Sequence, residues 1–172
     1  AGPGSIGLLC MQIARAAGAT VIIAGTTSDA ERLALAKRLG ASMAVDLTSQ
    51  DLPQIVVGLT AGQGADIYFE CSGAPAAARQ GLTLTRRGGQ YTQVGLFPGP
   101  FELPFDTIAY RELRVTGSLG QRSSSWRRGL ALLGQGLVDT RSLVSHILPL
   151  DSWQEAFRLA ESRQGLKIVL EP

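Results

Sequence analysis

Residues 1–7 read A-G-P-G-S-I-G, and within them Gly2, Gly4 and Gly7 follow the G-x-G-x-x-G spacing of a turn that leads from a strand into a helix. In such a turn the first glycine makes the tight bend, and the second lets the backbone come close to a pyrophosphate. The third lets the helix pack against the sheet. The spacing alone is weak evidence for a dinucleotide site, because glycine-rich turns also join ordinary strands and helices. The succession of strands and helices after the turn decides whether it indicates a dinucleotide site.

The helix that begins after the turn would supply the rest of a phosphate site. The backbone N–H groups near Ser5 and Ile6 have no partner inside the helix. The aligned peptide dipoles add roughly half a positive charge at that end. We therefore expect an anion to bind against Gly4, Ser5 and Ile6.

A regular alternation of strands and helices comes after the turn. Thr20–Ala24 is a β-branched run without polar alternation, typical of a strand buried on both faces of a parallel sheet. Further strands are predicted at 42–45, 65–71, 90–95 and 113–118, and helices at 28–39, 51–61, 75–85 and 125–137. This order predicts an α/β fold with a Rossmann-type, doubly wound parallel sheet, in which the first strand, before Gly2, is missing from the chain.

Several local signals refine these elements. Ser28 with Glu31 predicts a capping box at a helix N-terminus, and Asp51 is expected to open the next helix. Near the C-terminus a strand is predicted at 143–148, a helix from 151 and a strand at 167–170. The helices that contain Trp126 and Trp153 carry apolar residues at helical spacing, which predicts that these faces pack in a core.

Composition excludes several classes of protein. Hydrophobic residues make up 45% of the 172 residues and charged residues 17%, so the chain is too apolar to be disordered. The 16 basic and 14 acidic residues nearly balance, without the basic patch of a nucleic-acid-binding protein. No apolar run reaches the roughly 20 residues of a membrane-spanning helix. We expect a cytoplasmic protein that binds neither nucleic acid nor membrane.

The residues that most often hold metals are few. Cys10 and Cys71 are far apart in apolar settings, which indicates two buried thiols rather than a disulfide framework or a metal knuckle. His146 is the only histidine, and its apolar neighbours predict a structural place in a strand. No metal ligand is therefore assigned within this chain.

The end of the strand at Thr20–Ala24 bears on the choice between NAD and NADP. A dinucleotide fold that binds NAD carries a carboxylate there, about 20 residues beyond the glycines, to accept hydrogen bonds from the ribose. Gly25 occupies that place, and Thr26 and Thr27 come after it. These small residues leave room for a 2′-phosphate, which Arg32 would reach. The sequence therefore favours NADP over NAD.

Taken together, these features resemble the cofactor-binding half of the medium-chain, zinc-type alcohol dehydrogenases, nearest to the sorbitol and threonine dehydrogenase branch. The resemblance covers essentially all 172 residues. It rests on the glycine turn and on ten further segments, namely Ala30–Leu33, Gly40–Ala41, Gly64–Asp66, Phe69–Gly73, Arg87–Gly89, Val94–Gly95, Glu112–Leu113, Gly117–Ser118, Ser145–His146 and Pro149–Leu150. Each segment alone is weak evidence for the family, but the order and spacing of all the segments together are specific to it.

The resemblance implies the chemistry. In these enzymes a zinc ion polarises the alcohol or carbonyl oxygen while a hydride passes between the carbinol carbon and the nicotinamide. The zinc ligands and the catalytic residues would lie in an N-terminal domain upstream of Ala1, so we expect this chain alone to be inactive. The implied substrate is a small secondary alcohol or its ketone, and a homodimer or homotetramer is expected.

By resemblance, residues of this chain would bind the cofactor. Those that would line the ribose and nicotinamide come after two adjacent strands and are Ser72, Gly73, Val94 and Gly95. Ser118 and Leu119 would approach the carboxamide, and Lys167 would reach the pyrophosphate. Residues 1–142 would form the N-terminally truncated dinucleotide-binding domain, and residues 143–172 would return to the catalytic domain.

Three alternatives bear on the function. A zinc-independent quinone or enoyl reductase would share this half and differ only upstream, although Phe69–Gly73 favours the polyol type. A non-catalytic dinucleotide-binding module would need no upstream domain. A methyltransferase would require an acidic residue where Gly25 stands, which disfavours it. Because the first strand lies at the centre of a doubly wound sheet, a product with only these residues is expected to be unstable.

Overall fold

The computed structural model describes residues 1–172, with seven α-helices and seven strands. The helices are α1 (Ser5–Ala16), α2 (Ala30–Arg38), α3 (Leu52–Leu59), α4 (Pro75–Leu84), α5 (Asp106–Tyr110), α6 (Ser123–Gly134) and α7 (Trp153–Glu161). The strands are β1 (Ile22–Gly25), β2 (Met43–Asp46), β3 (Ala65–Glu70), β4 (Thr85–Gln93), β5 (Arg114–Gly117), β6 (Val144–Pro149) and β7 (Lys167–Glu171). None of the helices combines the length and the apolar character needed to cross a bilayer.

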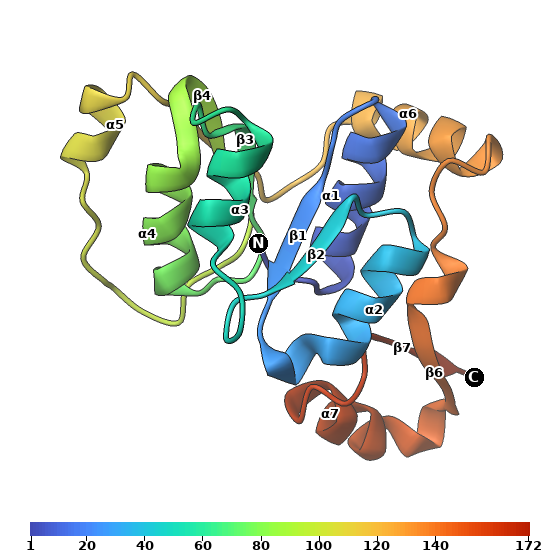
Figure 1. Ribbon diagram of the computed structural model, residues 1–172. Helices are drawn as coiled ribbons and strands as arrows, with labels where there is room; N and C mark the ends of the chain where they lie inside the picture. Colours follow the sequence, from blue (N-terminus) through green and yellow to red (C-terminus); the bar gives the residue numbers. More distant parts are fainter.

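Every strand pair is parallel. β1 pairs with β2, β3 pairs with β4, and β4 also pairs with β5. β6 and β7 form a separate parallel pair that carries α7, seen in orange and red in Figure 1. Parallel strands connected through helices form the predicted doubly wound α/β arrangement, so the fold prediction is confirmed.

Residues 1 and 2 lie between β1 and β3. The nitrogen of Ala1 donates to the carbonyl oxygen of Phe69 at 2.7 Å, and the Cys71 N–H donates to the carbonyl of Ala1 at 2.9 Å. On the other side, Gly2 N–H donates to the carbonyl of Ala24 at 2.9 Å. The resulting order is β2, β1, residues 1–2, β3, β4 and β5. This is the doubly wound order, with residues 1–2 in the place of its first strand.

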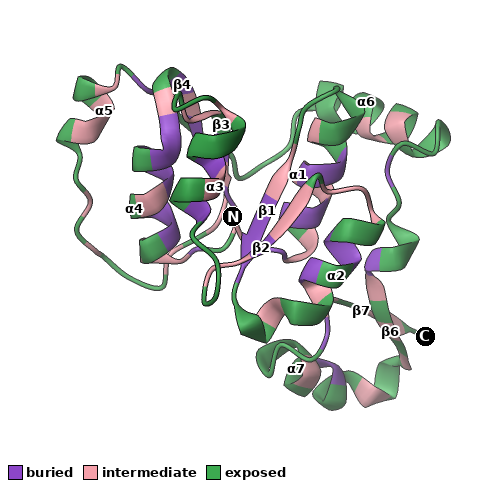
Figure 2. Cartoon of the chain, viewed as in Figure 1, coloured by how far each residue is buried: buried purple, intermediate pink, exposed green.

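The core forms two clusters, of which the first extends across this junction and the second lies on the side of α1 and α2 (Figure 2). The first joins β1, β2, α3, β3, α4 and β4 and consists of Ala24, Val45, Leu52, Val56, Tyr68, Leu82, Leu84, Tyr91 and Leu113. The second joins α1, β1 and α2 and consists of Leu8, Met11, Ile23, Leu33, Leu35, Ala36 and Leu143. Leu143 attaches the C-terminal segment to α1 and α2, so both halves of the chain support the glycine turn.

Of the two helix caps predicted from the sequence, one is confirmed and one is wrong. Asp51 caps α3, because its carboxylate accepts from the Gln54 N–H at 2.9 Å, as predicted. The capping box predicted at Ser28 and Glu31 is wrong. Asp29 instead accepts from both the N–H and the hydroxyl of Thr26, because a 3-10 turn over Thr27–Asp29 precedes α2.

The apolar faces of α6 and α7 are more exposed than predicted. Trp126 is 60% exposed and Trp153 is 51% exposed, and α6 contains no buried residue at all. The prediction that these faces pack in a core is wrong for this chain. On α7 only Ala156 is buried, where the helix packs against β6 and β7, and the large side chains of both helices stay exposed (Figure 2).

Candidate functional site

The glycine turn combines two tightly packed glycines with one that faces open space. Gly2 has φ of +91°, and a Cβ there would lie 2.7 Å from the Ser72 nitrogen. A Cβ at Gly7 would lie 1.9 Å from the carbonyl oxygen of Gly2. At Gly4, by contrast, a Cβ would meet no atom within 4 Å. The fold requires glycine at positions 2 and 7, whereas the open space at Gly4 fits an incoming group.

The N-terminus of α1 opens beside that space. The helix begins at Ser5, has no side-chain cap and carries no acidic residue in its first turn. Its first N–H groups therefore face neither a capping oxygen nor a competing carboxylate of the same turn. Ile6 is exposed, which leaves this end of the helix accessible. The arrangement suits an anion.

Lys167 lies close to this helix end. The hydroxyl of Ser5 donates to the carbonyl oxygen of Leu166 at 2.9 Å, which brings the start of β7 to the start of α1. Lys167 is the next residue and is exposed. Ser145 holds the same segment, since its hydroxyl accepts from the Leu166 N–H and donates to the carbonyl of Lys167. The role predicted for Lys167 toward a pyrophosphate stays a prediction.

The carboxyl end of β1 lies on one side of the turn. Gly25 is buried, and a Cβ there would lie 2.8 Å from Cγ of Pro3. An aspartate at this position would therefore displace the glycine turn itself. Thr26 and Thr27, the next two residues, are exposed.

Two carboxylates that the sequence did not place here accompany these threonines. Asp29 accepts from Thr26, and Asp46, at the end of β2, accepts from the hydroxyl of Thr27 at 2.8 Å. Hydrogen bonds from the hydroxyl and the N–H of Thr48, and from Thr27, hold the pKa of Asp46 below its usual value. Asp46 is therefore ionised at neutral pH.

Arg32 is engaged elsewhere. Its guanidinium donates to the carbonyl oxygens of Arg163 at 3.1 Å and Gly165 at 2.9 Å, and it lies 3.6 Å from the carboxylate of Asp29. These contacts join α2 to the segment before β7. The guanidinium predicted to meet a 2′-phosphate thus already has three acceptors within the chain.

The carboxyl ends of β3, β4 and β5 lie on the other side of the turn. Gly2 packs against Ser72, Gly73 packs against Gly95, and the Ser118 N–H donates to the carbonyl of Gln93 at 2.9 Å. The structure therefore brings the remaining predicted site residues into one row along the sheet edge, namely Ser72, Gly73, Val94, Gly95, Ser118 and Leu119. Leu119 is the most exposed of them, at 83%.

Sequence reasoning missed Glu70, the last residue of β3. It is fully buried, and its carboxylate accepts from the N–H of Ser72 at 2.8 Å, the N–H of Gly73 at 3.0 Å and Nε2 of Gln93 at 2.7 Å. The hydroxyl of Ser72 also donates to it. The available signal was an acidic residue directly after the apolar run 67–69, because a carboxylate buried at such a strand end requires donors of this kind.

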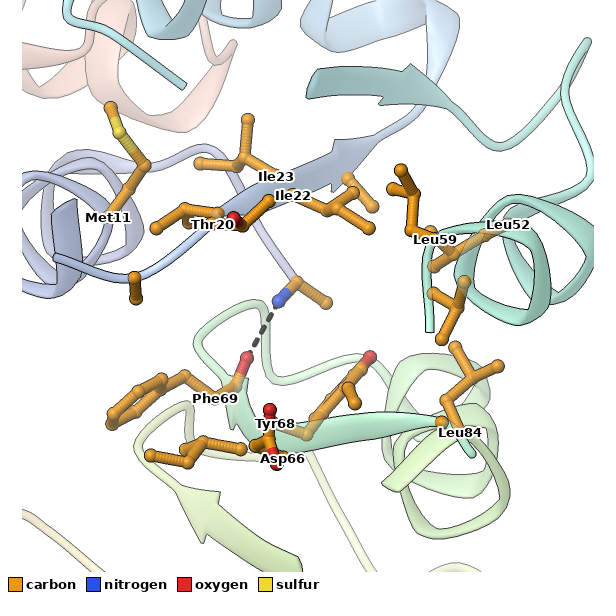
Figure 3. A pocket seen from close by; sticks show the side chains of 18 of the residues that line it. Met11, Thr20, Ile22, Ile23, Leu52, Leu59, Asp66, Tyr68, Phe69 and Leu84 are labelled. Atoms are coloured by element: carbon orange, nitrogen blue, oxygen red, sulfur yellow. Dashed lines mark hydrogen bonds between the residues drawn. The ribbon is translucent and has the colours of Figure 1, made fainter. Parts of the chain in front are cut away.

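A cavity of about 1010 Å³ separates β1 from β3 (Figure 3). Apolar side chains from both strands and from α3 line it, including those of Ile22, Leu59 and Tyr68, and the Ala1 to Phe69 hydrogen bond crosses between the two sides. Its walls are strand edges that pair with no other strand on that side. The cavity therefore belongs to the architecture of the sheet, at the position of the first strand of the doubly wound order.

Cys10 and Cys71 both line this cavity. They are free thiols, each partly buried. A hydrogen bond between them holds the pKa of Cys10 below its usual value and raises that of Cys71, because one thiolate is stabilised by the other thiol. No group of three or more His, Cys, Asp and Glu side chains is placed to hold a metal ion.

Comparisons with known proteins agree with this geometry. The sequence model of a family described as zinc-binding dehydrogenase matches residues 5–135. The chain is 42% identical to the sorbitol dehydrogenase of Halalkalibacterium halodurans, covering 99% of this chain and 50% of that protein. It is 40% identical to the D-arabitol-phosphate dehydrogenase of Enterococcus avium, covering 99% of this chain and 49% of that protein.

Solved structures show the same likeness. The 2R,3R-butanediol dehydrogenase of Bacillus subtilis superposes with a TM-score of 0.87 at 30% identity, over 99% of this chain and 49% of that one. The chain spans about half the length of the curated relatives and solved structures that it matches.

Proposed function

Because the chain belongs to the zinc-binding dehydrogenase family, we propose that it forms the dinucleotide-binding part of a longer NAD(P)-dependent polyol or alcohol dehydrogenase. The observation that carries this proposal is the turn at residues 2–7. Its outer glycines are required by packing, while Gly4 opens onto free space at the uncapped N-terminus of α1. Such a turn holds a pyrophosphate without any change in the fold.

We propose residues of this chain for the pyrophosphate and for the nicotinamide half of the cofactor. Gly4, Ser5 and Ile6 would hold the pyrophosphate, and Lys167 would add a positive charge beside it. The residues after β3, β4 and β5 would hold the nicotinamide half at the carboxyl edge of the sheet, where open α/β sheets bind their ligands. When bound, the nicotinamide would accept or donate the hydride.

We infer that the cofactor is NAD rather than NADP, against the expectation from the sequence. That expectation relied on Arg32 as a partner for the 2′-phosphate, but Arg32 is held by the carbonyl oxygens of Arg163 and Gly165. Asp29 and Asp46 place two carboxylates beside Thr26 and Thr27 instead. A 2′-phosphate at this strand end would meet the like charge of these carboxylates, while Arg32 is already engaged.

The substrate proposed is a small secondary alcohol of the polyol type, or the corresponding ketone. The names of the relatives, among them sorbitol, D-arabitol-phosphate and 2R,3R-butanediol dehydrogenases, support this class. Zinc and its ligands are proposed to lie in the part of the relatives that this chain does not match. Residues 143–172 are proposed to join that part, and a homodimer or homotetramer is proposed for the whole protein.

Calorimetric titration with NAD tests the cofactor site directly. We expect the full-length wild-type protein to bind NAD and its Gly4→Val variant to lose binding, because the valine side chain would fill the space proposed for the pyrophosphate. Gly129→Val is the matched control, since Gly129 also has open space around it but lies on α6. Equal NAD affinity for wild type and Gly4→Val, with both folded by circular dichroism, would rule out this site.

The reaction class has a separate test. Full-length protein is mixed with NAD and sorbitol, and the formation of reduced nicotinamide is followed by absorbance. Oxidation that stops when a zinc chelator is added is the expected result. Turnover of a quinone or an enoyl substrate without any alcohol oxidation would point instead to a zinc-independent reductase.

A further inference from the structure

We propose that Glu70 is a positioning residue, whose buried carboxylate fixes the loops after β3 and β4 in the shape that receives the nicotinamide half of the cofactor. This inference rests on the proposed function and adds a role for a residue that does not itself face the ligand space.

Glu70 has no charged side chain as a partner. It takes part in none of the ion pairs of the structure, each of which joins an arginine to another aspartate or glutamate. Its two oxygens are instead satisfied by N–H and O–H donors from Ser72, Gly73 and Gln93. A fully buried carboxylate is stable only with such a complete set of donors, so the geometry of these donors is tightly constrained.

The donors come from two different loops. Ser72 and Gly73 come after β3, whereas Gln93 ends β4 and its Nε2 also donates to the carbonyl of Gly95 at 2.7 Å. The carbonyl oxygen of Glu70 adds backbone contacts, accepting from the N–H groups of Val94 and Gly95 at 2.8 Å each. One residue therefore links both strand ends through its side chain and its backbone.

The glycines in these loops leave no room for another arrangement. A Cβ at Gly95 would lie 2.3 Å from the Gly73 nitrogen and 2.7 Å from the Glu70 carboxylate. A Cβ at Gly73, which has φ of +67°, would lie 2.2 Å from the carbonyl oxygen of Leu96. The two loops touch each other through their glycines, and the Glu70 carboxylate lies in that contact.

The substitution Glu70→Gln separates positioning from general stability. Glutamine keeps the size of the side chain but replaces one acceptor oxygen with an NH₂ group, which would face the N–H donors of Gly73 and Gln93. We expect the affinity for NAD to fall about tenfold, as for the loss of one charge-assisted hydrogen bond. The affinity for ADP should stay unchanged, because ADP has no nicotinamide half and would contact only the turn and the β1 end.

The experiment is calorimetric titration of NAD and of ADP into the full-length wild-type protein and its Glu70→Gln variant. Asp66→Asn is the matched control, since Asp66 is an exposed carboxylate on the same strand, far from its carboxyl end. A selective loss of NAD affinity in Glu70→Gln, with Asp66→Asn unchanged, supports the proposal. Unchanged NAD affinity, or an equal loss for NAD and ADP, overturns it.

Two further outcomes are possible: Glu70→Gln does not fold, or the wild-type protein binds neither ligand. If Glu70→Gln fails to fold, Gln93→Leu removes a single donor to the same carboxylate, and the same selective loss of NAD affinity is expected of it. An equal loss for both ligands in Gln93→Leu would overturn the proposal. If the folded full-length wild-type protein binds neither NAD nor ADP, the proposed function itself fails and this inference fails with it.

Discussion

Gly7 packs directly against Gly2, so that a Cβ on Gly7 would lie 1.9 Å from the Gly2 carbonyl oxygen. This contact fixes the first turn of α1 against the chain that enters from the sheet. Gly4 lies between the two and touches nothing on its open side. The turn thus separates glycines that the fold needs from one that ligand binding would need.

Gly7→Ala should lower the free energy of unfolding by about 1–3 kcal/mol, as for overpacking of a tight interior contact. The added methyl group would push the helix away from Gly2 or twist the turn. Urea unfolding followed by circular dichroism measures the difference.

Gly4→Ala is the matched variant for this stability test. Its methyl group meets open space, and the only expected loss is the weaker N-cap preference of alanine, about 1 kcal/mol or less. Equal destabilisation by both substitutions would contradict the packing account of the turn.

Asp46→Asn should raise the affinity for NADP relative to NAD by about threefold, as for removal of an exposed like charge. The amide oxygen still accepts from Thr48, and the amide NH₂ donates to the Thr27 hydroxyl in place of the bond that the carboxylate accepts, while the negative charge beside the expected 2′-phosphate is removed. Because the pKa of Asp46 is lowered, the wild-type preference for NAD should not change as the pH rises above neutrality.

The ratio of dissociation constants for NADP and NAD, measured by fluorescence titration, checks this prediction. Asp66→Asn removes an equivalent exposed charge from β3 and should leave the ratio as it is. A wild-type chain that binds NADP more tightly than NAD would show that the sequence-based expectation was right and that Asp46 does not select the cofactor.

Cys10 should be alkylated at a lower pH than an ordinary thiol. Its pKa is lowered by the hydrogen bond from Cys71, and the thiolate is the form that reacts. The rate of iodoacetamide labelling at Cys10, followed by peptide mass spectrometry, should rise earlier along a pH series in the wild-type chain than in Cys71→Ala. Superimposable pH profiles for the two proteins would show that the thiols do not interact.

The glycine turn and the order of the strands could be predicted from the sequence. The spacing of Gly2, Gly4 and Gly7 and the apolar run Thr20–Ala24 predicted a doubly wound sheet, and the parallel pairing of β1 to β5 confirms it. Asp51 was correctly predicted to cap its helix. These signals depend on residues within a few positions of one another, so the chain carries them in any context.

Other features depend on partners that are distant in the sequence. Arg32 meets carbonyl oxygens more than 130 positions away, and nothing near Arg32 in the sequence indicated this. The stripe at Trp126 looked like a core face, yet whether such a face is buried depends on what else packs against it. In the sequence, Glu70 was only part of a family motif. Its burial and its hydrogen bonds could not be predicted, because the donors come from two separate loops.

The sequence by itself determined the order of strands and helices and the backbone freedom of the glycine turn, because caps, periodicity and positive φ are properties of short segments. Only the tertiary structure decided which carboxylates stand beside Thr26 and Thr27 and what Glu70 holds together. Those contacts arise when separate strand ends meet at one edge of the sheet, and burial then requires each polar group to find its partner there.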